Sequence, residues 1–155
     1  MSQSDSGEFP ANLKVLSFVT MGFATLALLI GVPLFIANFD LPTFANVEFD
    51  TLEHFDLSFR YLLRFAGMVG SIVGGFALVA SVLTLLRSRL GWLMLVFLYL
   101  AGTCGCLYLL ALFVDLTTRY TIPLPTYPVV GLFFGVVSLG ILMNRTSRNF
   151  IFETA

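Results

Sequence analysis

Four long runs without a charged residue occupy most of this chain, and they constrain its fold more than any motif does. The runs cover Val15–Ala37, Phe65–Leu86, Leu90–Val114 and about Ile122–Met143. An α-helix rises about 1.5 Å per residue, so about 20 apolar residues cross a hydrocarbon core of roughly 30 Å. Each run is long enough for one crossing. The sequence therefore predicts an all-α integral membrane protein with four membrane-spanning helices.

Composition supports a membrane environment. Hydrophobic residues make up 58% of the chain and charged residues 11%, and the mean hydropathy is +0.96. A water-soluble core of this size would need polar residues to cover it, and long parts of this chain have none. The lipid bilayer is therefore the first expected partner, and no nucleic-acid partner is expected.

The runs predict one domain between two short polar tails. The tails are residues 1–12 and 144–155, and the domain is 13–143, with helices at about 13–38, 59–86, 90–114 and 126–143. Loops 39–58 and 115–125 lie between them on the external side. Prolines 123, 125 and 128 delay the start of the last helix. Short turns favour antiparallel up-down neighbours in a four-helix bundle.

A cleavable signal peptide is the alternative interpretation of the first run, because Lys14 precedes it near the N-terminus. The run is longer than the roughly 7–15 residues of a signal-peptide core. Its end, PLFIANFD, also lacks a small-x-small cleavage pattern. We therefore expect a helix that is retained in the protein.

Lysine and arginine near the helix ends predict the orientation, because these residues resist translocation. The side with both termini and the middle turn has five of them: Lys14, Arg87, Arg89, Arg145 and Arg148. The other side has three: Arg60, Arg64 and Arg119. We therefore expect a multi-pass protein of the inner (plasma) membrane with both termini in the cytoplasm.

Charged residues at the outer helix ends are the candidate ligand-binding residues: Arg60, Arg64, Asp115 and Arg119. In one interpretation the arginines extend to the headgroups and anchor the helix at the interface. In the other, Arg60 or Arg64 faces the bundle and holds an anionic ligand or a lipid headgroup. Arg64 lies one turn deeper, so we expect it to turn inward while Arg60 stays at the interface.

Small residues at helical spacing are predicted to hold the helices together. Lipid removes the hydrophobic drive between helices, so close backbone approach has to replace it. The candidate packing residues are Gly67, Gly70, Gly74, Gly75, Gly105, Gly131 and Gly135. The GxxxG pair Gly70 and Gly74 is alternatively a homodimer face.

Patterns for catalysis, metal binding or redox chemistry are few. The four runs contain no Asp, Glu, Lys, Arg or His, which argues against proton-coupled export through a buried carboxylate. The only histidine, His54, lies in an acidic loop, and haem binding would require ligands inside the membrane. Cys104 and Cys106 are two apart on one helix and cannot form a relaxed disulfide. We expect no catalytic residue, no metal and no cofactor.

The second helix opens with FRYLL, which contains Arg60 and Tyr61, and continues with GMVGSIVGG. With the chain length and the polar segment after the first helix, this pattern resembles small four-span bacterial membrane proteins of the DoxX-like kind and related domains of unknown function. The resemblance covers most of residues 13–143. It implies a bacterial inner-membrane protein with no established cofactor.

The leading functional hypothesis is a non-enzymatic polytopic membrane protein. It is either free-standing or an accessory subunit of a larger membrane complex, and a homodimer is a further possible assembly. The alternative is a small-molecule or lipid-binding carrier with a site for an anionic group at the outer mouth. The two differ in whether the outer charges converge on a cavity or point to the headgroups.

Overall fold

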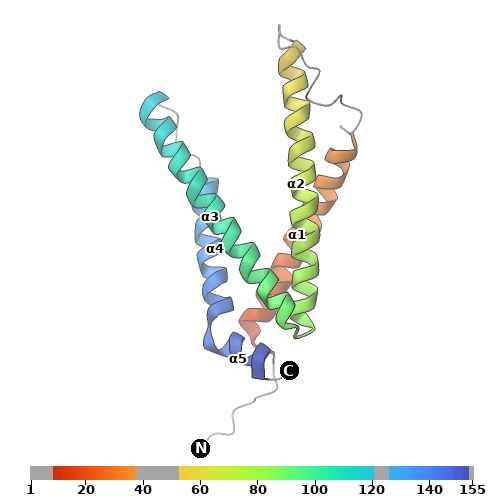
Figure 1. Cartoon of the computed structure of the whole chain (residues 1–155), viewed down its shortest axis with the longest axis vertical. Helices are drawn as coiled ribbons and strands as arrows, with labels where there is room; N and C mark the ends of the chain where they lie inside the picture. Colours follow the sequence, from red (N-terminus) through yellow and green to blue (C-terminus); the bar gives the residue numbers. More distant parts are fainter. Residues whose placement is uncertain (1–8, 38–52, 121–125, 154–155) are drawn as a thin grey trace, which may run out of the picture. The chain divides into compact units, whose positions relative to one another are not determined.

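The structure is a computed structural model that describes residues 9–37, 53–120 and 126–153. Of these described residues 94% are helical, and none lies in a strand. The helices are α1 (Ala11–Ala37), α2 (Glu53–Leu85), α3 (Arg89–Tyr120), α4 (Tyr127–Met143) and α5 (Arg145–Glu153) (Figure 1). The prediction of an all-α fold is confirmed.

Among the described helices, three are long and apolar enough to cross a membrane: Ala11–Ala37, Arg60–Leu85 and Arg89–Asp115. A fourth candidate is the pair Tyr127–Met143 and Arg145–Phe152, which is bent by 52°. Large apolar side chains point outward along these helices, and Phe133 is 73% exposed. A water-soluble protein rarely exposes so much apolar surface, whereas lipid accommodates it. The chain is a multi-pass membrane protein, as predicted.

Helices α2 and α3 extend beyond the predicted spans. Helix α2 begins at Glu53 rather than near residue 59, and α3 continues to Tyr120 rather than ending near 114. In the sequence these extensions carry acid-then-base pairs at four-residue spacing, such as Asp56 and Arg60, a pattern that favours a helix. The apolar runs therefore mark the membrane-crossing part of each helix and not its full length.

The predicted C-terminal tail contains an additional helix. Helix α5 follows α4 directly after Asn144, whose backbone angles of φ −58° and ψ 138° interrupt the helix. Its nine residues, RTSRNFIFE, include basic and apolar side chains. Residues 145–153, within the predicted C-terminal tail, are therefore helical.

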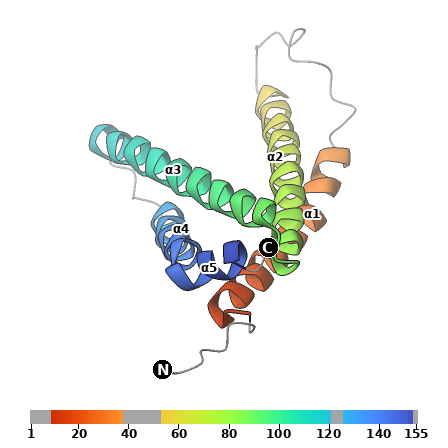
Figure 2. The same ribbon diagram turned by 60° about the horizontal axis from the view of Figure 1, so that its bottom comes forward.

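The chain consists of two compact units, and each is described by itself. The α1–α2 unit is Thr20–Leu78, in which α1 and α2 lie side by side (Figure 1). The α3–α5 unit is Met1–Val19 with Val79–Ala155, and in it α4 runs beside α3 (Figure 2). The core of the second unit comprises Leu13, Leu16, Ala80, Trp92, Leu95, Tyr99, Leu142, Phe150 and Ile151.

Candidate membrane-interface site

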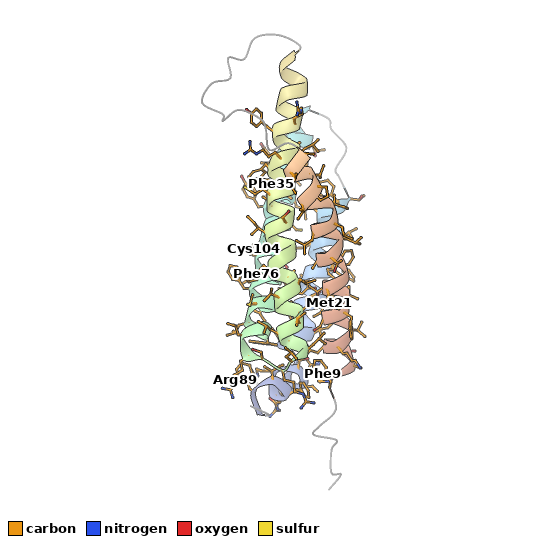
Figure 3. All side chains as sticks on the ribbon, turned by 90° about the vertical axis from the view of Figure 1, so that its right-hand side faces the viewer. Phe9, Met21, Phe35, Phe76, Arg89 and Cys104 are labelled. Atoms are coloured by element: carbon orange, nitrogen blue, oxygen red, sulfur yellow. The ribbon has the colours of Figure 1, made fainter. Side chains whose placement is uncertain are left out.

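Aromatic and basic side chains gather in the α3–α5 unit where α1 begins, α2 turns into α3, and α5 follows α4. Figure 3 shows two of them, Phe9 and Arg89, at this end beside α5. We term the group the α5 platform, and its members are Phe9, Arg87, Arg89, Trp92, Phe150 and Phe152.

The turn between α2 and α3 places Arg87 in the left-handed region, with φ 59°. The Arg87 N–H donates to the Thr84 carbonyl at 3.0 Å, and the Ser88 N–H donates to the Leu83 carbonyl at 2.9 Å. These two bonds form a Schellman motif, in which glycine usually occupies the left-handed position. A side chain there costs roughly 1–2 kcal/mol. Such strain points to a role for the Arg87 side chain beyond the turn.

That role is contact with α5. The Arg87 guanidinium carbon lies 4.4 Å from the ring centroid of Phe150, and that of Arg89 lies 5.4 Å from the ring centroid of Phe152. A guanidinium within about 6 Å of a ring is attracted by its negative face, by about 0.5–1 kcal/mol at exposed sites. Both rings belong to α5, so the two cation–π contacts attach α5 to the turn.

The first turn of α3 also caps the carboxyl ends of α4 and α5. The Trp92 Nε1–H donates to the Leu142 carbonyl at 3.1 Å, and the Arg89 guanidinium donates to the Phe152 carbonyl at 3.2 Å. The last four carbonyls of a helix have no donor within the helix. Trp92 therefore satisfies a carbonyl immediately before the α4–α5 bend, and Arg89 satisfies one at the end of α5.

Edge-to-face ring contacts complete the α5 platform. Phe9 and Phe150 have ring centroids 4.8 Å apart with an interplanar angle of 62°, and Trp92 and Phe152 are 5.4 Å apart at 83°. Such pairs add about 0.5–1.5 kcal/mol beyond their buried area. Phe9 precedes α1, so these contacts join the beginning of α1 to α5.

Gly91 allows α3 to begin directly against the end of α2. A Cβ on Gly91 would lie 2.6 Å from the carbonyl carbon and from the Cβ of Leu83. Backbone at that distance cannot move aside without displacing the helix, so glycine is required by this close approach. The sequence reasoning missed Gly91 because it lies at a helix start, outside the small-xxx-small pattern.

The residues of the predicted outer mouth fall on both units. Arg60 is exposed and Arg64 half-buried on α2, in the α1–α2 unit, whereas Asp115 is exposed on α3, in the α3–α5 unit. The side chain of Arg119 lies outside the described residues. The convergence of these four residues on one site stays a prediction.

Arg60 is exposed and Arg64 is half-buried, and this difference leads to a test of whether Arg64 turns inward. We expect Arg64→Lys to lower the melting temperature of the purified protein more than Arg60→Lys does. If Arg64 faces inward as predicted, lysine cannot reproduce the planar donor fork of its half-buried guanidinium, and an acceptor that loses its partner costs about 1–3 kcal/mol. Thermal unfolding of both variants in the same detergent measures this. Equal and negligible losses would leave both arginines as interfacial anchors only.

Four of the predicted packing glycines have close neighbours. A Cβ on Gly67 would lie 2.6 Å from the Phe35 nitrogen, and one on Gly74 would lie 3.0 Å from the Ala24 carbonyl oxygen. In the α3–α5 unit the corresponding pairs are Gly131 with Cys106 Sγ, at 2.8 Å, and Gly135 with the Thr103 hydroxyl. Gly67 meets backbone, which cannot rotate away, whereas the neighbours of Gly131 and Gly135 are side-chain atoms and the approach at Gly74 is tight but less severe.

The other three have more space. A Cβ on Gly70 would lie 3.7 Å from the Ala27 carbonyl oxygen, which is an ordinary van der Waals distance. A Cβ on Gly75 or Gly105 would meet no atom within 4 Å in the part of the chain that the structure describes. The first four glycines therefore have close neighbours and the other three do not, although all seven occur at helical spacing in the sequence.

Several hydroxyls in the interior bond to their own helix. Each of the following donates to the carbonyl four residues earlier: Ser17 at 2.9 Å, Ser71 at 2.7 Å, Thr84 at 2.8 Å and Thr103 at 2.6 Å. This back-bonding supplies a partner for a hydroxyl inside a membrane helix. The O–H groups of these side chains are therefore used in hydrogen bonds within their own helices.

The cysteines and the histidine are the residues that metal or redox chemistry would use. Cys104 is exposed and Cys106 half-buried, and both are free thiols. Among the described residues no three His, Cys, Asp or Glu side chains come together as a metal site would require. The side chain of His54 lies outside these residues.

Comparison of the chain with protein-family models, with curated proteins and with solved structures finds no match. The resemblance to DoxX-like proteins stays a prediction.

Proposed function

We propose that the protein is a non-enzymatic multi-pass protein of the inner (plasma) membrane that acts as an accessory or structural subunit of a membrane assembly. The observation that supports this most is how its polar side chains are used. Hydroxyls bond to their own helices, Trp92 and Arg89 cap helix ends, and Arg87 holds α5. The side chains of the α5 platform thus join segments of the chain to one another and give the unit a fixed end.

The proposed architecture is a four-helix bundle with antiparallel neighbours, in which α4 is the fourth span and α5 lies at its end. In the α1–α2 unit, Gly31 approaches Gly67 while Ala24 approaches Gly74, so positions run in opposite directions along the two helices. The α3–α4 pairs follow the same reversed order: Cys106 with Gly131, and Thr103 with Gly135. Both sets of contacts support the proposal.

The proposed orientation places both termini in the cytoplasm. Within the α3–α5 unit, the beginning of α1, the α2–α3 turn and α5 lie at one end. The basic residues there are all exposed: Lys14, Arg87, Arg89, Arg145 and Arg148. Segments rich in lysine and arginine stay on the cytoplasmic side.

Accessibility labelling tests the orientation. In a background with Cys104→Ala and Cys106→Ala, a membrane-impermeant maleimide should label Thr51→Cys in intact cells and leave Ser88→Cys unlabelled. Ser88→Cys should react once the membrane is opened, which controls for its reactivity. The reverse pattern would exclude cytoplasmic termini.

The subunit role has its own test. Extraction from the native membrane in a mild detergent, followed by native electrophoresis, should place the chain in a complex with a fixed partner well above its own 17.1 kDa. A chain that migrates alone under all mild conditions would contradict the subunit role and leave a free-standing bundle.

A further inference from the structure

Exposed basic side chains lie on three separate segments of the α3–α5 unit, and two of them, Arg87 and Arg89, belong to the α5 platform. We term them the basic rim, and its members are Lys14, Arg87, Arg89, Arg145 and Arg148, all exposed. The acidic residues of segments 1–19, 87–89 and 144–155 are Asp5, Glu8 and Glu153. Five basic residues against three acidic ones leave these segments with a net charge of +2.

Large exposed apolar side chains adjoin the basic rim at two of its three segments. Val15 follows Lys14 and is 61% exposed, while Leu86 and Leu90 flank the turn arginines and are 71% and 60% exposed. Exposed apolar residues beside exposed basic ones are the arrangement found where hydrocarbon meets headgroups. This arrangement supports a boundary between the lipid core and the headgroups at the basic rim.

Helix α5 has the form of a helix that lies at this boundary. It departs from α4 by 52°, directly after the apolar run ends. Phe150 and Ile151 are buried against the unit, whereas Arg145 and Arg148, three positions apart, share the exposed face. The contacts of α5 with the turn fix the helix that carries these two exposed arginines.

We propose that the basic rim binds the headgroups of anionic glycerophospholipids, with Arg145, Arg148 and Lys14 as the principal contacts. A guanidinium donates two parallel hydrogen bonds to a phosphate, and the positive rim attracts the extra negative charge of an anionic lipid. Each Lys or Arg near an anionic membrane surface strengthens binding roughly fivefold. The inference rests on the proposed function only in placing this end at a membrane surface, and it does not need a partner subunit.

The single tryptophan of the chain, Trp92, is a reporter within the α5 platform. The full-length protein is reconstituted into phosphatidylcholine vesicles that contain phosphatidylglycerol, with brominated acyl chains on one lipid or on the other. Brominated chains quench tryptophan fluorescence, so quenching reports which lipid lies beside Trp92. We expect phosphatidylglycerol to associate at least about five times more strongly than phosphatidylcholine at this site, which is the gain from a single basic contact.

Two double variants of α5 test whether its positive charge, and not its fold alone, causes the preference for the anionic lipid. The ratio of association constants should fall toward one in Arg145→Gln/Arg148→Gln, and it should be largely retained in Arg145→Lys/Arg148→Lys. Thr146→Ala, an exposed neutral change on the same helix, is the matched control and should keep the parent ratio. An unchanged Trp92 emission maximum verifies that α5 remains docked.

Two results would overturn the lipid site. One is equal quenching by the two brominated lipids in the parent protein, and the other is a preference that survives in the glutamine variant. If the glutamine variant misfolds, the parent protein is titrated with salt instead. Its preference for the anionic lipid should weaken as the salt concentration rises, because salt screens the attraction between the basic rim and the headgroups, and a preference that does not change with salt would overturn the lipid site. Labelling of Ser88→Cys from outside together with an intact lipid preference would reject the proposed orientation and leave the lipid site standing.

Discussion

One added methyl group at Gly67 should push α1 away from α2, whereas the same group at Gly70 should be tolerated. A Cβ on Gly67 would lie 2.6 Å from the Phe35 nitrogen and 2.8 Å from the Gly31 carbonyl oxygen. These are backbone atoms, so they cannot relieve the clash by a side-chain rotation. Overpacking of this kind costs about 1–3 kcal/mol. We therefore expect Gly67→Ala to lower the melting temperature clearly.

Gly70→Ala is the matched control, since it makes the same change about one turn further along α2. Its nearest neighbour would be the Ala27 carbonyl oxygen at 3.7 Å, and alanine favours the helix over glycine by about 0.8–1 kcal/mol. This variant should melt at or above the temperature of the parent. The measurement is thermal unfolding by circular dichroism in one detergent. Identical curves for the two variants would contradict the close α1–α2 approach.

Trp92→Phe should loosen the α4–α5 bend. The change keeps an aromatic ring near Phe152 but removes the Nε1–H that donates to the Leu142 carbonyl. Leu142 is 0% exposed, so its carbonyl loses this donor in a place without water. Leaving a buried acceptor without its partner costs about 1–3 kcal/mol.

Hydrogen exchange locates the effect of Trp92→Phe. Backbone amides of α5 should exchange faster in the variant, while those in the middle of α3 should change little, because the lost bond supports only the bend. Phe152→Leu is the companion variant, since it removes the ring contact and keeps the indole donor. If Phe152→Leu affects α5 as much as Trp92→Phe does, the ring contact and not the hydrogen bond holds the bend.

The membrane-crossing helices could be predicted from the sequence because a bilayer imposes a minimum apolar length on them. Hydropathy alone did not place the ends of α2 and α3, since a helix continues beyond its apolar run wherever its backbone bonds are maintained, and hydropathy does not record those bonds. The four-residue spacing of Asp56, Arg60 and Arg64 was the sequence signal for the extension of α2. Helix α5 was missed because nine residues are far below that length. A signal was present nonetheless: Ser147, Phe150 and Ile151 are buried at spacings of three and four.

Packing glycines show a second limit of sequence reasoning. Gly67, Gly70 and Gly74 all occur at helical spacing, yet their surroundings differ because the rotation of α2 about its axis decides which glycine meets α1 most closely. Spacing alone does not contain that rotation. The α5 platform could not be predicted from the sequence for a related reason. Arg87 and Phe150 are far apart in the sequence, and only the fold brings them together.

The contact between Phe9 and Phe150 has a consequence for how the protein is made. These residues are 141 positions apart, so the segment just before α1 contacts a segment that is synthesised 141 residues later. Leu13 and Leu16 of α1 share a core with Ile151 of α5, which is likewise synthesised long after them. That part of the core can form only after α5 has been synthesised, because contacts between distant segments cannot form before both exist. Until α5 has been synthesised, the apolar side chains at the amino end of α1 lack part of their packing partners, and α5 then covers them.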